Sequence, residues 1–543
     1  MKNPNRFDRK RLRIDHLIKW FFGSNALLAI VVLALITLFL FREGAGFFPQ
    51  NLENLRIYRL AGLEYVEPMR DQVEAHTALN RSLQDLRLRQ VNALLKAGKS
   101  PEAANAALAK FDQFVTAFDD SVQELRGIVS DLTETVSAIK EKAKIREDAL
   151  QQRKFLLAEG KRAEADAVTV TPIDFAAELA PVKAVFPLYQ KAALEFRGKI
   201  ETLLLQPPIL PVKELDPRFQ QFQKATRAYL SSFPASEHKL REWNQFAPIP
   251  WYWSVTAFLF GKEWITNSFW QDWYGVLPLL TGSLLVAAIA LVIAVPMGVC
   301  AAIYVSELAN ASEQRLIKPY IEFISAIPSV VLGFFGVAVL GETIRQISGG
   351  SLHWIPFVPW DAQPFAGIEH TFASLMSAVP FFPISERLNA FTAGCLLALM
   401  AIPTIFSLSE DALNSVPRVF KEASYALGAT RLQTVFRILV PASLSGIISA
   451  VLLGFGRVIG ETMVVLLCAG NRIAIPDFTQ GLSAVFQPVH TMTGIVAQEL
   501  GEVPNGTIQY RALFMVGLLL FFLALFINWL AQAIVRRYKI SIG

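Results

Sequence analysis

The chain has 543 residues, of which 53% are hydrophobic and only 18% are charged, and its mean hydropathy is +0.38. Soluble domains carry about 25% charged residues, so this composition argues against a soluble enzyme. The net charge of +5 arises in residues 1–42, which hold eight Lys or Arg and two Asp. A basic tail of this kind sets membrane topology, and it argues against a nucleic-acid-binding surface.

The first long apolar run covers residues 21–41 and follows a basic tail, residues 1–20. A helix needs about 20 apolar residues to cross a bilayer core that is about 30 Å thick. This run is longer than the core of a signal peptide, which has about 7–15 apolar residues. No small-residue cleavage site follows before Phe47. We therefore expect an uncleaved membrane anchor whose N-terminal side lies in the cytoplasm.

The second half of the chain contains five further apolar runs, which are residues 276–305, 319–341, 389–408, 443–468 and 512–535. Six crossings would return the C-terminus to the cytoplasm, together with segments 306–318, 409–442 and 536–543. These three segments carry nine Lys or Arg, whereas the outer loops 347–386 and 470–508 carry one. The excess of positive charge on the cytoplasmic side favours this topology. The sequence thus predicts an all-α, polytopic membrane protein with six transmembrane helices.

Residues 42–275 form a predicted extracytoplasmic domain that is rich in strong helix formers. Apolar residues recur there at steps of three and four, and they are Leu108, Phe111, Val115, Phe118, Val122, Leu125, Val129, Leu132, Val136, Ile139 and Ala143. Such a heptad seam predicts one coiled-coil helix about 54 Å long. Its start is marked by Ser100 as N-cap and Pro101 at the first helical position.

Further helices are expected over residues 72–96, which would form an antiparallel hairpin with the seam helix, and around 174–203. Two roles remain open for this helical domain, a rigid arm packed on itself or a docking surface for an extracytoplasmic partner. The domain ends in an aromatic segment, residues 251–274, which holds five of the ten Trp of the chain. Rings just before a membrane span are typical of the headgroup level, and an aromatic protein core is the alternative.

A patterned segment lies in the predicted cytoplasmic loop 409–442, where Lys-Glu-Ala-Ser-Tyr-Ala-Leu-Gly at 421–428 precedes Ile-Leu-Val-Pro at 438–441. We expect a short amphipathic helix over 418–427 that ends at Gly428 in the left-handed conformation. A second helix is expected over 430–439 and should stop before Pro441. Such a pair of helices could receive a push from a soluble partner, although any membrane protein can contain an amphipathic loop.

These residues resemble the EAA loop of ABC-importer permeases, in which E-A-A, three residues, G and nine residues precede I-x-L-P. Ser424 stands where the family has a third small residue, and Val440 replaces the Leu. In that family the loop forms the coupling helix, which docks on the ATPase subunit. The resemblance implies this coupling role for four residues, Glu422, Ala423, Gly428 and Pro441.

A second segment, Gly-Phe-Gly-Arg-Val-Ile-Gly-Glu-Thr-Met at 454–463, lies inside the fifth predicted span. Arg457 and Glu461 are four residues apart and would share one helix face. Charges within a bilayer are costly unless they face a partner or a watery cavity, so both are candidates for function. The Arg fork suits a tetrahedral oxyanion because it donates two parallel hydrogen bonds. A structural ion pair that stabilises the bundle is the alternative.

The same segment, together with Ala-Ile-Pro-Ser-Val-Val at 326–331, resembles high-affinity phosphate permease subunits, the PstC type more than PstA. The resemblance covers roughly residues 276–543 and leaves the helical domain unexplained. It implies that Arg457, Glu461 and Thr462 line the phosphate pathway. We expect Glu461 to orient Arg457 and to weaken its grip on the anion, so that phosphate can be released.

Other motifs limit what the chain can do by itself. Glu342 and Arg345 are three residues apart at the end of the third predicted span, which predicts a local salt bridge. The six His show no metal-binding spacing, and no Walker A motif is present, so no catalytic or metal-ligating residue is expected. ATP would be bound by a partner subunit, and this chain is expected to hold no cofactor.

The sequence therefore predicts a permease subunit of an ATP-driven phosphate importer in a bacterial inner membrane, surrounded by lipid. The resemblance implies three kinds of partner, a second PstA-like permease, two copies of a PstB-like ATPase and a PstS-like phosphate-binding protein. Two alternatives remain, a permease for another oxyanion such as sulfate or molybdate and a membrane sensor with an outer helical arm.

Overall fold

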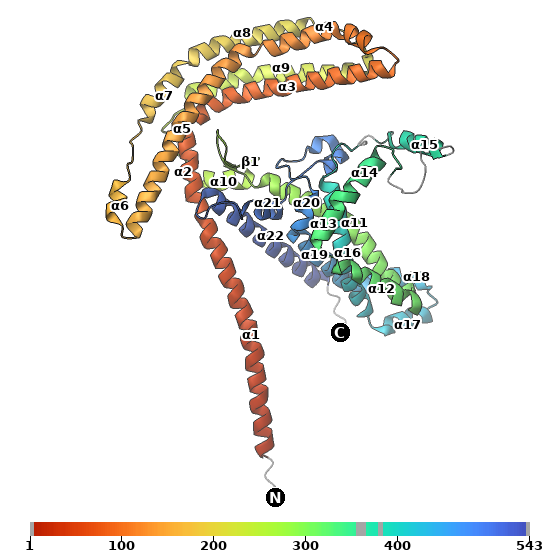
Figure 1. The fold of residues 1–543 in the computed structure, drawn as a ribbon. Coiled ribbons are helices and arrows are strands. Elements are labelled where there is room, and N and C mark those ends of the chain that lie inside the picture. The colour runs from red at the N-terminus through yellow and green to blue at the C-terminus, as the bar shows by residue number, and fades with distance from the viewer. Residues whose placement is uncertain (1–4, 354–364, 378, 380–383, 539–543) are drawn as a thin grey trace. The chain divides into compact units, whose positions relative to one another are not determined.

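The computed structural model describes residues 5–353, 365–377, 379 and 384–538, and it is almost entirely helical (Figure 1). The chain divides into two compact units. The membrane unit comprises residues 1–50, 254–266 and 273–543, and the helical unit comprises residues 51–253 and 267–272. Two helices contain residues of both units, α2 (Phe47–Leu60) and α10 (Tyr252–Phe260).

The membrane unit is built from helices and one short β-hairpin. Its elements are α1 (Asn5–Ala45), β1 (Trp264–Ile265), β2 (Trp273–Tyr274), α11 (Leu277–Ile303), η2 (Tyr304–Leu308), α12 (Ala311–Ala326), α13 (Ser329–Phe335), η3 (Gly336–Leu340), α14 (Gly341–Ser348), α15 (Phe365–Ser377), α16 (Ala390–Asn414), α17 (Arg418–Ala426), α18 (Arg431–Thr434), η4 (Val435–Leu439), α19 (Val440–Gly460), α20 (Met463–Cys468), η5 (Phe478–Phe486), α21 (Met492–Glu499) and α22 (Ile508–Tyr538).

Six helical runs in the described part of the chain are long and apolar enough to cross a membrane. They are Ile18–Leu60, Leu277–Leu308, Ser329–Ser348, Ala390–Asn414, Arg431–Gly460 and Ile508–Ile534. The predicted class, an all-α protein with six transmembrane helices, is therefore confirmed. Several spans differ from their predicted limits, the first of them by running on to Leu60, and in the third and fifth spans the difference has a local cause.

The third span begins later than predicted, because the helix breaks at Pro328. Proline disfavours a helical conformation in the residue before it, and Ile327 is extended with φ −70° and ψ 124°. The predicted run 319–341 therefore joins parts of two elements, α12 and the span that starts at Ser329. α12 has no buried residue and exposes Leu316, so it is a separate amphipathic helix.

The fifth span also differs at both ends. The helix expected to stop before Pro441 instead continues from Arg431 to Gly460. A π-helical turn makes this possible, since the Val440 N–H donates to the Val435 carbonyl, one residue further back than in an α-helix. Pro441 then falls in the first turn of α19, where its missing N–H is tolerated. At the other end α19 stops at Gly460, and the predicted end at 468 belongs to α20.

The core of the membrane unit lies between α11, α16 and α19. Its buried side chains are mostly small and aliphatic, and they include Ala290, Ala294, Ala393, Leu397, Ala401, Ile405 and Val458. Small residues allow helix backbones to approach closely in a membrane. At Gly454 on α19, a Cβ atom would lie 2.8 Å from Cγ1 of Ile405 on α16. This contact holds α19 against α16 near the segment that carries Arg457.

The helical unit is a bundle of long helices (Figure 1). Besides parts of α2 and α10 it contains α3 (Leu63–Lys96), α4 (Pro101–Asp120), α5 (Gln123–Ala158), α6 (Arg162–Ala167), α7 (Phe175–Ala184), α8 (Phe186–Leu205), η1 (Lys213–Leu215) and α9 (Asp216–Glu242). Figure 1 shows α3 beside α4 and α9, as the antiparallel hairpin requires. The helices predicted over 72–96 and 174–203 are confirmed as parts of α3 and of α7 with α8.

All eleven residues of the predicted seam are buried, but they do not lie on one helix. The chain turns at Ser121 and Val122, so α4 ends at Asp120 and a new helix follows. The seam also faces several helices, since Phe118 packs against Phe222 of α9 and stacks on His76 of α3. The prediction of a single coiled-coil helix is therefore wrong. The seam residues form part of the buried core of a multi-helix bundle.

The aromatic segment is divided between protein cores and exposed positions. In the membrane unit, Trp264 and Tyr274 are paired across the β-hairpin and both are buried. In the helical unit, Trp270 is buried and the Arg70 guanidinium lies 4.6 Å from its ring centre. Trp251 is 74% exposed. The expectation of a headgroup belt is therefore wrong for the buried rings, which fill protein cores.

Candidate functional site

The segment that resembles the EAA loop forms two short helices joined by a tight turn. α17 ends in two bonds that define a glycine-type C-cap, since the Gly428 N–H donates to Tyr425 O at 2.9 Å and the Ala429 N–H donates to Ser424 O at 3.2 Å. Gly428 has φ +81°, a left-handed conformation that glycine adopts without steric cost. The predicted end of this helix at Gly428 is therefore confirmed.

The turn into α18 is fixed by side chains. Thr430 and Gln433 form a capping box, in which Gln433 N–H donates to Thr430 Oγ1 at 3.3 Å and Thr430 N–H donates to Gln433 Oε1 at 2.9 Å. The hydroxyls of Ser424 and Thr434 are buried and lie 2.8 Å apart. Ser424, which departs from the family pattern, thus bonds the two helices together. The 418–439 loop is consequently a rigid element.

The 418–439 loop presents an exposed surface that is partly apolar. Glu422, Ala423 and Gly428 are all exposed on it. Large apolar side chains surround them, namely Val419, Tyr425, Leu427, Leu432 and Phe436, and Leu427 is 90% exposed. Exposed apolar patches with charged neighbours are typical of protein-docking surfaces. Pro441, the fourth residue of the predicted coupling set, lies instead in α19, where it permits the continuous helix described above.

Arg457 lies in the last turn of α19, and its guanidinium is exposed. Nη1 donates a hydrogen bond to Thr404 Oγ1 on α16 at 3.1 Å. The predicted partner Glu461 lies beyond the end of α19, with φ −72° and ψ 135°, so the two residues no longer share a helix face. Among the described residues, Arg457 and Glu461 form no ion pair. The expected orienting role of Glu461 and the structural ion pair are therefore both wrong for this conformation.

The helix break at Glu461 and Thr462 is stabilised from the sides. The Glu461 carboxylate accepts a hydrogen bond from the Met463 N–H at 3.2 Å, at the start of α20. Thr493 Oγ1 donates to the Glu461 carbonyl at 2.9 Å. Non-helical backbone at membrane depth persists only where protein covers it or water reaches it. Arg457, Glu461 and Thr462 are all at least partly exposed at this break.

Thr404 is the site residue that the sequence reasoning missed. It lies in the fourth span, one residue after Pro403, in an otherwise apolar stretch. A polar residue in such a position was the available signal, but its partner on another helix could not be inferred without an arrangement of the spans. The structure thus shows a hydroxyl instead of a carboxylate as the group that holds Arg457, and Arg457 forms no ion pair with any other residue that the structure describes.

Comparison with known proteins identifies the family. Residues 294–540 match the family described as "Binding-protein-dependent transport system inner membrane component". The phosphate transport system permease protein PstC of Haemophilus influenzae is 33% identical over 287 residues, which are 52% of this chain and 84% of that protein. The chain belongs to the family of binding-protein-dependent transport permeases that includes PstC. It is a PstC-like ABC importer permease of the multi-pass inner-membrane type.

Other relatives agree with this assignment. The probable ABC transporter permease protein YqgH of Bacillus subtilis is 32% identical over 284 residues, 51% of this chain and 79% of that protein. PstC of Mesorhizobium japonicum is 30% identical over 291 residues, 52% of this chain and 81% of that protein. The family match covers the 418–439 loop and Arg457, whereas residues 51–253 of the permease lie outside it.

Two other candidate features of the permease are structural. Arg345 and Glu342 form the predicted local salt bridge, with Nη2 2.6 Å from Oε1. Neither side chain is buried, so this salt bridge contributes little to the stability of the fold. Within the described residues, no three His, Cys, Asp or Glu side chains gather as a metal site would require.

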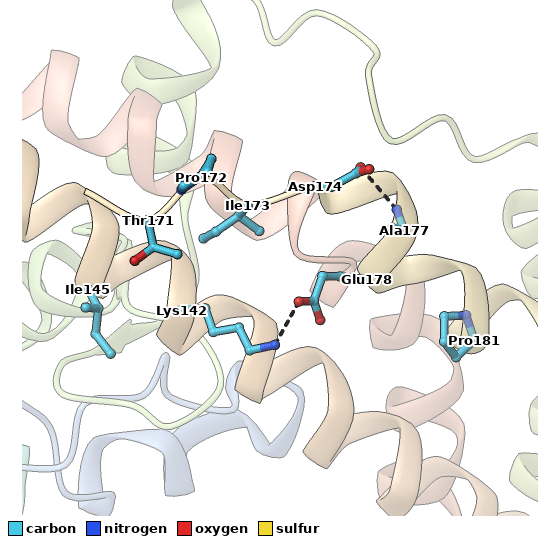
Figure 2. Close-up of a pocket in the computed structure, with 9 residues that line it drawn as sticks. All are labelled: Lys142, Ile145, Thr171, Pro172, Ile173, Asp174, Ala177, Glu178 and Pro181. Atoms are coloured by element: carbon cyan, nitrogen blue, oxygen red, sulfur yellow. Dashed lines mark hydrogen bonds and ion pairs between the residues drawn. The ribbon is translucent and has the colours of Figure 1, made fainter. Parts of the chain in front are cut away.

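The helical unit contains a cavity of about 610 Å³ beside α5 and α7 (Figure 2). Its charged groups are already engaged by the protein. Lys142 Nζ lies 2.8 Å from Glu178 Oε1, and Asp174 accepts a hydrogen bond from the Ala177 N–H at the start of α7 (Figure 2). Asp174 also accepts from the Ala176 N–H. The cavity therefore offers a ligand little charge that is not already neutralised, and we assign it no substrate.

Proposed function

We propose that this permease imports inorganic phosphate across a bacterial inner membrane at the expense of ATP hydrolysed by a separate subunit. The observation that carries the proposal is the 33% identity to a PstC protein over 84% of that protein's length. Arg457 supplies the chemistry, because its exposed guanidinium is held by a neutral hydroxyl and keeps its full charge for an anion. A planar fork of donors matches the oxygen atoms of a tetrahedral oxyanion.

The proposed mechanism is alternating access driven from the 418–439 loop. Glu422, Ala423 and Gly428 form part of the surface that the ATPase would contact, and closure of the ATPase dimer would displace α17. The cap at Gly428 and the Ser424 to Thr434 bond keep the loop rigid, so it moves as one body. The helical run from Arg431 to Gly460 then carries the displacement toward Arg457. At 1.5 Å per residue this path is about 40 Å long.

Anion release requires that Arg457 does not hold a dianion too tightly. In the proposed path, Thr404 keeps the guanidinium in place, and Glu461 and Thr462 line the break next to it. Movement of α19 relative to α16 would separate Arg457 from Thr404 and change the number of donors that the anion meets. In this scheme Pro441 does not contact the ATPase. It lies at the junction between the 418–439 loop and α19, through which the displacement passes.

The proposed complex contains two different permeases, two copies of an ATPase and a soluble binding protein. By family, these are a PstA-like permease, a PstB-like ATPase that binds ATP, and a PstS-like phosphate-binding protein outside the membrane. Both termini of this chain and the 418–439 loop would lie in the cytoplasm, and residues 42–275 outside it. The helical unit then serves as a rigid arm or as a docking surface for an extracytoplasmic partner.

Uptake of labelled phosphate by cells that lack their own phosphate importers tests the substrate. We expect ATP-dependent uptake when the permease is produced with its partner subunits, and no competition from excess sulfate or molybdate. Competition by either anion would favour another oxyanion importer. Absence of uptake of any oxyanion by a complete complex would favour a sensor. Co-purification of an ATPase subunit with the permease is the parallel test of coupling.

A further inference from the structure

Lys421 of α17 forms an ion pair with Glu307, which lies 114 residues earlier in the chain. Lys421 Nζ is 2.5 Å from Glu307 Oε1, and the Glu307 side chain is only 6% exposed, against 27% for Lys421. Glu307 belongs to η2, a π-helical turn at the end of α11. A carboxylate this buried must keep an opposite charge beside it, because separation would leave an uncompensated charge in weakly polar surroundings.

This ion pair joins the 418–439 loop to a helix outside it. α17 packs mainly on α18 and η4, the two elements that follow it in the same loop. The hydrogen bond from Ser424 to Thr434 also stays within the loop. The bond of Lys421 to Glu307 therefore gives the loop a charged link to α11 that is separate from its two chain connections, to α16 and to α19.

α11 leads to the other partner of the Arg457 hydrogen bond. Buried residues of α11, among them Ala290 and Ala294, share one apolar cluster with Ala401 and Ile405 of α16. α16 carries Thr404, the hydroxyl that holds Arg457. The 418–439 loop is thus linked to this hydrogen bond along the chain, through α16 to the hydroxyl and through α19 to the guanidinium, and also through Lys421, Glu307 and α11, which packs on α16.

We propose that the Lys421–Glu307 ion pair is a positioning contact that passes displacement of the 418–439 loop to α11 and α16. The inference rests on the proposed function, in which an ATPase displaces α17. When α17 moves, the end of α11 follows because the buried pair is costly to separate. Glu307 lies at the end of the continuous helical run Leu277–Leu308, so a displacement at Glu307 passes along that run into α11.

Charge reversal in the permease within its complete complex tests this contact. The variants are Lys421→Glu, Glu307→Lys and the double exchange of both, reconstituted with the ATPase in lipid vesicles. The measurement is phosphate transported per ATP hydrolysed, together with the amount of ATPase that co-purifies. We expect each single reversal to lower transport per ATP about tenfold or more while the ATPase stays bound, and the double exchange to restore it to within about threefold.

A second ion pair in the same part of the permease supplies the matched control. Lys318 of α12 pairs with Glu410 of α16, whose side chain is 11% exposed, and neither residue belongs to the 418–439 loop. Charge reversal there removes a somewhat more exposed pair of the same kind without touching α17. We expect the Lys318→Glu variant to reduce the amount of folded permease and to leave transport per ATP unchanged.

If the single-reversal variants do not accumulate as folded protein, a neutral double variant, Glu307→Gln with Lys421→Gln, tests the role of the ion pair. It leaves no buried charge, so it should fold, and we expect it to keep the ATPase bound with lowered transport per ATP. Normal transport per ATP in this variant, or in either single reversal, would overturn the proposal. If wild type carries a different oxyanion, the proposed substrate fails, and the same ratio measured with that anion still tests the ion pair.

Discussion

Replacement of Gly428 by alanine should weaken attachment of the ATPase through backbone strain alone. Gly428 has φ +81°, and no atom outside its immediate neighbours lies within 4 Å of the position that a Cβ would occupy. The substitution therefore causes no clash, and its cost is that of a left-handed alanine, about 1–2 kcal/mol. A cost of this size lowers the ratio of capped to uncapped turns by a factor of roughly 5–30.

The assay is the apparent Kd of the ATPase subunit for the permease in detergent. If the capped 418–439 loop is the docking conformation, the Kd should rise by up to the same factor, roughly 5–30, as its population falls. Gly98→Ala is the matched control, because Gly98 has φ +82° and equally open surroundings in the turn between α3 and α4. It carries the same strain away from the loop. Equal ATPase affinity in wild type and Gly428→Ala, or an equal loss in both variants, would refute the reasoning.

Three further predictions concern other parts of the permease. Thr404→Val removes the hydroxyl that holds Arg457, so we expect the KM for phosphate uptake to change by about 3- to 10-fold. Thr404→Ser keeps a hydroxyl and should stay near the wild-type KM. Initial uptake rates give the KM of both variants. Burial lowers the pKa of His76 to about 4, so the unfolded chain binds more protons and stability should fall as pH drops from about 6.5 to about 4. Urea unfolding of the full permease at several pH values should show a flatter profile for His76→Gln, and an unchanged profile would exclude this role. Gly454→Ala should lower the thermal stability, since its Cβ would press on Ile405, and Ile405→Ala in the same chain should recover part of the loss.

The local features of the 418–439 loop could be predicted because each depends on residues close in sequence. The left-handed Gly428 follows from its place after an amphipathic helix. The N-cap at Ser100 follows from the Pro101 directly after it. The six spans could be predicted equally well, because length and hydropathy alone identify them. Their exact limits were not, since Pro328 breaks a helix in a long apolar run whereas Pro441 is accommodated by a π-helical turn.

The partner of Arg457 could not be predicted, because it depends on how two spans pack. Spacing alone placed Glu461 on the face of Arg457, but α19 ends at Gly460 and the carboxylate turns to the backbone of Met463. The same limit explains the missed link between Lys421 and Glu307. The buried seam residues were recognised, whereas the turn at Ser121 was not, because its backbone stays close to helical and it contains neither Gly nor Pro.

Phosphate uptake by the Arg457→Ala variant in the complete complex tests the central claim most directly. The account predicts that wild type takes up labelled phosphate in an ATP-dependent manner. It also predicts that the variant loses uptake and phosphate-stimulated ATP hydrolysis while the ATPase remains bound. An Arg162→Ala variant, which removes an exposed cation from α6 in the helical unit, serves as the control and should transport normally. Uptake and stimulated hydrolysis at wild-type levels in Arg457→Ala would contradict the account.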